Sequence, residues 1–268
     1  MAAKKVNLNA RTFLVLSGSS NPLGQMLAQE MCGRLATGSM ALILDENRAQ
    51  LELLEKLLKQ QLKPNSVQIF TGLLNADHSN GAHLLEQSLQ GRHRNDFERA
   101  IIVHNEGDAA THILMEPQTE LAWTDYVQRH LYAPVALNQH FLNSEALTGI
   151  EKLVVNVTSS LQVRPLVYNT LLCSCKRARD MYFRSMASEE ALADVHVLSY
   201  GPGLFDTHQT QCGINGNYLI PEELLMVSQD QIMLRVQPLQ STLKLINILE
   251  KIAFVSGHDV DYYDTFNL

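Results

Sequence analysis

The sequence predicts an α/β protein built around one doubly wound parallel sheet with helices on both faces. Two observations support this prediction: short runs of consecutive apolar residues recur along the 268-residue chain, and longer segments with apolar residues at helical spacing separate them. The runs are continuously apolar rather than alternating, which is typical of parallel strands buried between two layers of helices. The expected strands are residues 12–16, 40–44, 66–70, 100–103, 153–157 and 195–199.

The segments between these runs carry the helices. Helical sequence follows the first run to about residue 35, and leucines recur at helical spacing across 46–62. No low-complexity linker and no repeat interrupts the chain, so residues 12–268 are expected to form a single domain after an N-terminal extension of residues 1–11. Residues 201–221 are rich in glycine and asparagine and are expected to form a loop, a candidate lid over a ligand.

Composition excludes several classes of protein. The chain has 21 Lys and Arg against 28 Asp and Glu, a net charge of −7, and no dense basic cluster, so we expect no nucleic-acid partner. It has no apolar run of about 18 residues and no signal-peptide pattern at the start, so we expect no membrane association. The four cysteines, at 32, 173, 175 and 212, lack zinc or disulfide spacing. We therefore expect reduced thiols in a cytoplasmic protein.

A glycine-bearing turn follows the first expected strand, with the sequence SGSSNPLG at residues 17–24. Backbone amides at such a turn, together with the positive end of the following helix, suit a pyrophosphate, but a purely structural turn is an alternative. Pro22 removes one amide donor and fits the first turn of a helix. The candidate cofactor-binding residues here are Gly18, Ser20, Asn21 and Gly24.

Acidic residues follow the second expected strand. Asp45 could accept hydrogen bonds from the adenosine ribose of NAD, and its charge would repel the 2′-phosphate of NADP. The alternative is an acidic N-cap, from Asp45 or Glu46, for the helix expected at 46–62. Both roles can hold together.

Several motifs resemble those of the short-chain dehydrogenase/reductase family, and in particular of its sepiapterin reductases. The turn at 17–24 resembles TGxxxGxG with proline in place of the middle glycine, and the similarity extends from about residue 12 to 264. The other matches are HNEG at 104–107 with NNAG, VVNVTSS at 154–160 with VVNISS, LLCSCKRARDM at 171–181 with YCAGKAARDM, YGPGLFDT at 200–207 with YAPGPLDT, and the tail SGHDVDYYD at 256–264 with SGAHVDFYD.

The resemblance implies a Rossmann-type fold and NADPH-dependent reduction of a pterin side-chain carbonyl, a step of tetrahydrobiopterin biosynthesis. It also implies a homodimer formed through two long helices near 122–142 and 170–188. By resemblance, individual positions take roles as follows: Ser160 binds the substrate carbonyl, Lys176 holds the nicotinamide ribose, Asn105 and Gly107 support the cofactor, Pro202 and Gly203 close over the nicotinamide, and Asp261 anchors the pterin.

Two positions bear on the chemistry. His130 falls at the place of a family asparagine that helps to relay protons, although a surface or interface histidine is the alternative. The family tyrosine should lie four residues before Lys176, but Leu172 occupies that position and has no proton to donate. Tyr168 is the nearest tyrosine and is expected to lie ahead of the helix.

The sequence therefore leaves two functions open. One is a reductase in which Ser160, helped by His130 or water, replaces the tyrosine. The other is a catalytically inert protein that binds a pterin, a dinucleotide or a protein partner. The cofactor is NADP(H) by resemblance, NAD(H) by Asp45, or absent.

Overall fold

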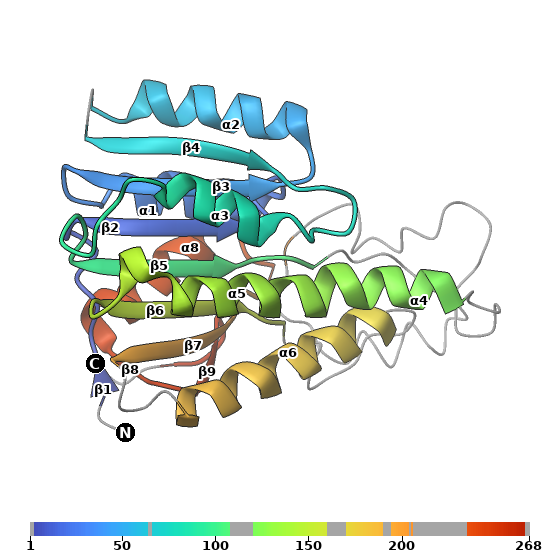
Figure 1. The fold of residues 1–268 in the computed structure, drawn as a ribbon. Helices are drawn as coiled ribbons and strands as arrows, with labels where there is room; N and C mark the ends of the chain where they lie inside the picture. Colours follow the sequence, from blue (N-terminus) through green and yellow to red (C-terminus); the bar gives the residue numbers. More distant parts are fainter. Residues whose placement is uncertain are drawn as a thin grey trace.

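The computed structural model of the chain has a seven-stranded parallel sheet at its centre (Figure 1). It describes residues 3–63, 66–107, 120–159, 170–189, 194–203, 205 and 235–265. A separate antiparallel pair, β1 with β8, lies beside this sheet. The strands are β1 (Ala3–Lys4), β2 (Thr12–Ser17), β3 (Ser39–Asp45), β4 (Val67–Leu73), β5 (Arg99–His104), β6 (Glu151–Val157), β7 (Val195–Gly201), β8 (Phe254–Val255) and β9 (Asp259–Asp261).

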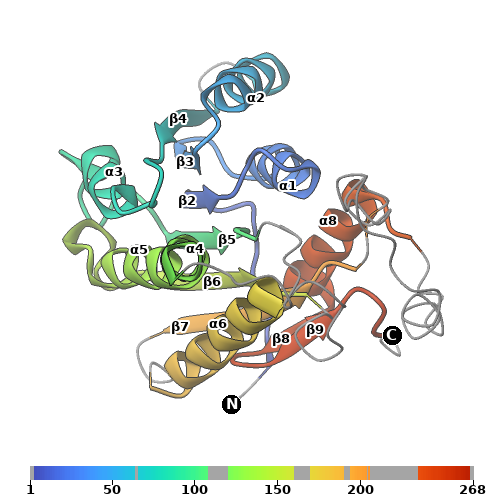
Figure 2. The same ribbon diagram turned by 90° about the vertical axis from the view of Figure 1, so that its right-hand side faces the viewer.

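Helices cover both faces of the sheet, as the sequence predicts (Figure 2). Helices α1, α2 and α8 pack on one face, and α3, α5 and α6 pack on the other. The helical segments are α1 (Pro22–Cys32), α2 (Arg48–Gln61), α3 (Gly81–Leu89), α4 (Glu120–Val127), the π-helical η1 (Gln128–Tyr132), α5 (Ala133–Asn143), the 3₁₀ turn η2 (Glu145–Leu147), α6 (Thr170–Glu189), α8 (Pro238–Asn247) and the π-helical η4 (Ile248–Ile252).

The strand order places the candidate site. The sheet runs β4-β3-β2-β5-β6-β7-β9, so its direction of winding reverses between β2 and β5. In doubly wound sheets ligands bind at such a reversal, outside the carboxyl ends of the strands. β2 and β3 are buried along their whole length, which confirms the prediction from their continuous apolar runs. The glycine turn follows β2 directly and therefore lies at this switch point.

Both ends of the described chain pack against the domain. In the N-terminal segment, Val6 and Leu8 are fully buried. In the C-terminal segment, β9 adds a seventh strand beside β7, and Asp261 pairs with Gly201. The terminal strands β1 and β9 are only two and three residues long. Runs of that length are too short to give a periodic signal in the sequence.

Two helix expectations need correction. Helix α2 begins at Arg48, and its N-cap is Asn47, whose side chain accepts from Gln50 N; neither Asp45 nor Glu46 caps it. Asparagine is among the strongest N-cap residues, which explains why the helix begins after it. The long helix expected at 122–142 is continuous in direction but contains the π-helical turn η1. Most of the loop expected at 201–221 lies outside the described residues.

No helix in the described part of the chain has the length and apolar character needed to cross a bilayer.

Candidate active site

The glycine turn is built as a tight connection between β2 and α1. Gly18 adopts φ +74°, a conformation that glycine adopts without strain. Asn21 caps α1 by accepting from Gly24 N at 2.8 Å, and Pro22 occupies the first helical turn, as predicted. A Cβ at Gly24 would lie 2.3 Å from Gly18 O, so a side chain at this position cannot be accommodated without moving the turn.

Asn105, at the end of β5, holds this turn in place. Its side-chain amide donates to Gly18 O at 2.7 Å and to Asn21 Oδ1 at 3.1 Å. A Cβ at Gly18 would lie 2.8 Å from the backbone of Asn105, so the two segments are in direct contact. The carboxyl ends of β2 and β5 are therefore fixed to each other at the switch point.

Asp45 lies at the end of β3, next to the turn, and is buried. Its Oδ2 accepts from Ser20 N at 2.7 Å, and its Oδ1 accepts from Asn47 N at 2.9 Å. Each carboxylate oxygen can accept a further hydrogen bond, as a ribose diol would require. The Asp45 side chain is thus held beside the glycine turn by two backbone amides.

These residues fit a nicotinamide dinucleotide, with fewer phosphate donors than a glycine-rich turn provides. Pro22 has no N–H, and the N–H of Gly24 already donates to the Asn21 side chain. The N–H of Leu23 is therefore the donor that remains in the first turn of α1. Ser19 Oγ is buried and has no hydrogen-bond partner among the described residues. Burying such a hydroxyl is costly without a partner, so a ligand phosphate would satisfy it.

Lys176, on α6, is directed to the same edge of the sheet and is buried. Its ammonium group donates to Glu106 O and to Val157 O, both at 2.7 Å, so it joins the ends of β5 and β6. One of its three N–H donors remains for a ligand hydroxyl. Burial, followed by the charge of Arg179, lowers the pKa of Lys176 well below its usual value.

Gly107 makes room for this lysine. A Cβ at Gly107 would lie 2.8 Å from Lys176 Nζ and 3.6 Å from Leu172 Cδ1. Leu172 therefore points to the same place as Lys176, one helical turn away, as the sequence predicts for the tyrosine position. Its side chain is buried in an apolar cluster with Tyr126, Leu171 and Cys175.

A buried charged network lies beneath the lysine. Arg179 is fully buried, and it donates to His104 O at 3.1 Å, Glu106 O at 2.9 Å, His130 O at 3.4 Å and Asn156 Oδ1 at 2.9 Å. Its guanidinium also lies 3.5 Å from the Glu106 carboxylate. Burial alone would raise the pKa of Glu106, but the neighbouring His104, whose Nδ1 lies 4.0 Å from Glu106 Oε1, and the charge of Arg179 hold it far below its usual range. Arg179 thus connects α6 with the ends of β5 and β6 and with η1.

His130 lies in η1 and is buried, which makes the interpretation as a surface histidine wrong. Its ring contacts Tyr126, with 4.2 Å between the ring centroids, and neither ring nitrogen has a hydrogen-bond partner among the described residues. Burial and the charges of Arg129, Lys176 and Arg179 lower the pKa of His130 to about 3. The imidazole is therefore neutral at neutral pH and cannot deliver a proton as an imidazolium.

Asp261 reaches the same edge of the sheet from β9. It is half-buried over the end of β7, where a Cβ on Gly201 would lie 2.4 Å from Asp261 Oδ2. Its Oδ1 accepts from Tyr263 N at 3.0 Å. Burial raises the pKa of Asp261.

Pro202 and Gly203 follow β7 at the same edge. Pro202 O accepts from Ser241 Oγ at 2.8 Å, and Gly203 adopts φ +83° with no room for a Cβ beside Val236. Ser160 and Tyr168 lie outside the described residues, as does Cys212. No disulfide joins the cysteines of the described residues, Cys32, Cys173 and Cys175.

The fold therefore brings together the glycine turn, Asp45, Asn105, Lys176, His130 and Asp261 at the carboxyl edge of one sheet. The sequence assigned no role to Arg179 or Glu106, although the motif around Lys176 includes the arginine. The available signal was a glutamate where the family has alanine and an arginine one helical turn after the lysine. This fold and this site define a dinucleotide-fold oxidoreductase.

Comparison with known proteins agrees with this class. Residues 13–213 match the family model of the short chain dehydrogenases, so the chain belongs to the short chain dehydrogenase family. The chain is 27% identical to the sepiapterin reductase of Xenopus laevis, over 98% of this chain and 100% of that protein. It is 28% identical to the sepiapterin reductase of Rattus norvegicus, over 93% of this chain and 95% of that protein. Within the family, the chain is sepiapterin reductase-like.

Solved structures show the same fold. The L-sorbose reductase of Gluconobacter frateurii, in a complex with NADPH and L-sorbose, superposes with a TM-score of 0.73 at 18% identity, over 96% of this chain and 97% of that one.

Proposed function

We propose that this chain binds a nicotinamide dinucleotide, with preference for NAD(H), and is a sepiapterin reductase-like carbonyl reductase of low activity. Asp45 supports the cofactor preference, because its buried carboxylate would accept from a ribose diol and repel a 2′-phosphate. Leu23 N and Ser19 Oγ would meet the phosphates, and Lys176 would hold the nicotinamide ribose. When bound, the nicotinamide supplies the hydride.

The proposal of low activity rests on one observation: Leu172 lies beside Lys176, where the proton donor would be. A positioned general acid is worth about 10²–10⁴ in rate, and leucine has no proton to transfer. The lowered pKa of His130 means that its ring offers no imidazolium proton at neutral pH. The proton would then come from water or from Ser160, with Tyr168 as a further hydroxyl.

The substrate we propose is a pterin with a side-chain carbonyl. Asp261 is half-buried at the carboxyl edge of the sheet, and a carboxylate can accept two parallel hydrogen bonds from a 2-amino-pyrimidinone edge. Similarity to sepiapterin reductases along nearly the whole chain supports the same class of ligand. Asp261→Asn should weaken pterin binding and leave dinucleotide binding unchanged.

The test is reduction of sepiapterin by the purified protein, followed by absorbance with NADH and NADPH side by side, together with calorimetry of each ligand. We expect slow turnover, faster with NADH, and measurable binding of NADH. Equal or better turnover with NADPH would contradict the role of Asp45. If neither NADH nor NADPH binds, the proposed function as a whole is contradicted.

A second candidate function is a catalytically inert binding protein. The packing of Leu172 into an apolar cluster with Tyr126 and Cys175 favours it, because that cluster occupies the place where an acid would act. Pterin binding at micromolar concentration without turnover would identify this function. If the chain binds neither a pterin nor a dinucleotide, its ligand would instead be a protein partner.

We also propose that the chain forms a homodimer through α4, η1 and α6. Trp123, Tyr132 and Met181 are exposed on these segments, with 37%, 65% and 52% of their surfaces accessible. Exposed large apolar side chains on neighbouring helices are typical of an association surface.

A further inference from the structure

A groove lies on the opposite side of the molecule from the candidate active site, along the outer edge of β4. It has a volume of about 590 Å³ and starts where β3 and β4 begin, at the amino edge of the sheet. The candidate site lies at the carboxyl edge, so the groove is independent of it. The lining residues are Gly38, Ser39, Lys59, Leu62, Lys63, Val67, Gln68, Ile69 and Arg92.

β4 is an edge strand with an open side. It pairs with β3, and no other strand of the described residues pairs with it. Ile69, Phe70 and Thr71, in the middle of the strand, are only half-buried. Unpaired N–H and C=O groups along an edge strand are able to pair with a further extended chain.

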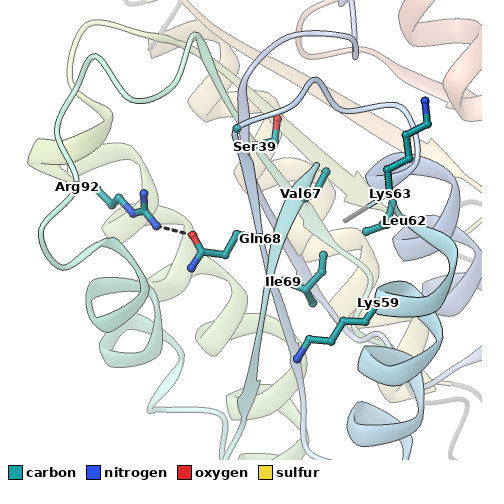
Figure 3. A pocket seen from close by; sticks show the side chains of 9 residues that line it. Ser39, Lys59, Leu62, Lys63, Val67, Gln68, Ile69 and Arg92 are labelled. Atoms are coloured by element: carbon teal, nitrogen blue, oxygen red, sulfur yellow. Dashed lines mark hydrogen bonds between the residues drawn. The ribbon is translucent and has the colours of Figure 1, made fainter. Parts of the chain in front are cut away.

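Positive charge flanks this edge on both sides. Lys59 and Lys63 extend from the end of α2 on one side of β4, whereas Arg92 donates to Gln68 Oε1 at 2.6 Å on the other side (Figure 3). Lys59 is paired with Glu55 at 2.5 Å, so the three cations and this carboxylate leave two positive charges at the groove. The whole chain has a net charge of −7, which makes this local excess distinct from the rest of the molecule.

Apolar side chains form the floor between these cations. Leu62, Val67 and Ile69 line the groove beneath Lys59 and Lys63. A partner strand would place alternate side chains on this floor, beside Lys59 and Lys63, and its other side chains would face Arg92 on the opposite side of β4. A second copy of β4 is disfavoured as the occupant, because pairing two such edges would bring the same positive charges together.

We propose that the edge of β4 binds an extended, acidic segment of a partner protein, which adds to the sheet as an eighth strand. Backbone hydrogen bonds to β4 give the affinity, and Lys63 and Arg92 select for acidic side chains. This surface is separate from the dinucleotide site and does not depend on its activity.

The test uses a fluorescein-labelled octapeptide of alternating valine and glutamate, and a second peptide with glutamine for each glutamate. Fluorescence anisotropy at low salt should show binding of the acidic peptide only, weakened as salt is raised. Lys63→Glu/Arg92→Glu should weaken binding by about tenfold or more, since attraction becomes repulsion. Lys56→Glu, at an exposed position on α2 outside the groove, should bind like the unmodified protein.

Amide hydrogen exchange gives a second readout. Peptide binding should slow exchange in residues 67–73 beyond the protection that pairing with β3 gives, and this additional protection should be absent in the double variant. The proposal is overturned if the double variant binds the peptide as well as the unmodified protein does, or if Lys56→Glu weakens binding as much as the double variant. It is also overturned if peptide binding gives no protection in β4. Displacement of the peptide by millimolar inorganic phosphate without change in β4 exchange would instead identify a small-anion site.

Discussion

Leu172 lies where an enzyme with a positioned tyrosine would have its proton donor, one helical turn before Lys176. Both side chains point to the space beside Gly107, so the position on α6 is retained and the functional group is lost. The lysine donates to two backbone carbonyl groups, and its own orientation does not depend on a tyrosine.

Leu172→Tyr should therefore restore the acid. We expect sepiapterin reduction to rise by about 10²–10⁴-fold, because a phenol at this position would lie one turn from Lys176. Steady-state kinetics with NADH measures the change. Leu172→Phe adds the ring without the hydroxyl and serves as the control; an equal rise in that variant would show that pocket shape, rather than proton donation, limits the rate.

His130 predicts a pH dependence of stability. Its folded pKa of about 3 lies below the usual value of about 6.5, so the unfolded chain binds the extra proton between these values. Stability should fall as the pH drops from about 6.5 toward 3, by up to about 1.4 kcal/mol per pH unit from this residue.

Urea unfolding at pH 4.5 and 6.0 measures this slope. His130→Gln should flatten it, whereas His83→Gln, at an exposed position on α3, should leave it unchanged. The assignment to His130 is contradicted when both variants keep the slope of the unmodified protein.

At the scale of elements, the ends of β2, β5 and β6 are held together by side chains that bond to backbone. Asn105 ties the glycine turn to β5, and Arg179 ties α6 to β5, β6 and η1. Replacing one member of a buried charge pair leaves the other uncompensated, so Glu106 and Arg179 depend on each other. These contacts give the site a rigid frame whether or not a reaction takes place.

The turn between β2 and α1 tests this frame. Gly24→Ala should destabilise the protein by about 1–3 kcal/mol and abolish dinucleotide binding, because the new Cβ would lie 2.3 Å from Gly18 O. Gly81→Ala, at the start of α3, has no neighbour closer than 3.6 Å and should be nearly neutral. Thermal unfolding and calorimetry with NADH compare the two; normal NADH binding by Gly24→Ala would contradict the assigned site.

At the scale of the whole molecule, exposed apolar side chains gather on the segments proposed for dimerisation. Tyr132→Ser/Met181→Ser should convert a dimer into a monomer in sedimentation velocity, because these side chains have 65% and 52% of their surface exposed. Leu53→Ser, at a position on α2 that is 60% exposed, is the matched control and should leave the association unchanged. A monomeric unmodified protein would contradict the proposed dimer.

The sequence by itself predicted the doubly wound sheet, its helices on both faces and the glycine turn after the first strand. These features follow from local patterns: β2 and β3 are continuously apolar because both of their faces are covered, and Asn21 and Pro22 are typical of a helix start. The absence of the tyrosine was equally visible, because a spacing of four residues before Lys176 fixes the position in any helix.

Only the tertiary structure decided the rest. Arg179, Glu106 and His104 form one network because α6 and β5 pack together, and residues 73 positions apart in the chain carry no shared pattern. The neutral state of His130 follows from burial beside Lys176 and Arg179, which the sequence of η1 does not reveal. The two-residue pairing of β1 with β8 and the basic edge of β4 likewise depend on which segments become neighbours after folding. Local sequence specifies the elements, whereas burial and long-range electrostatics arise only when those elements meet.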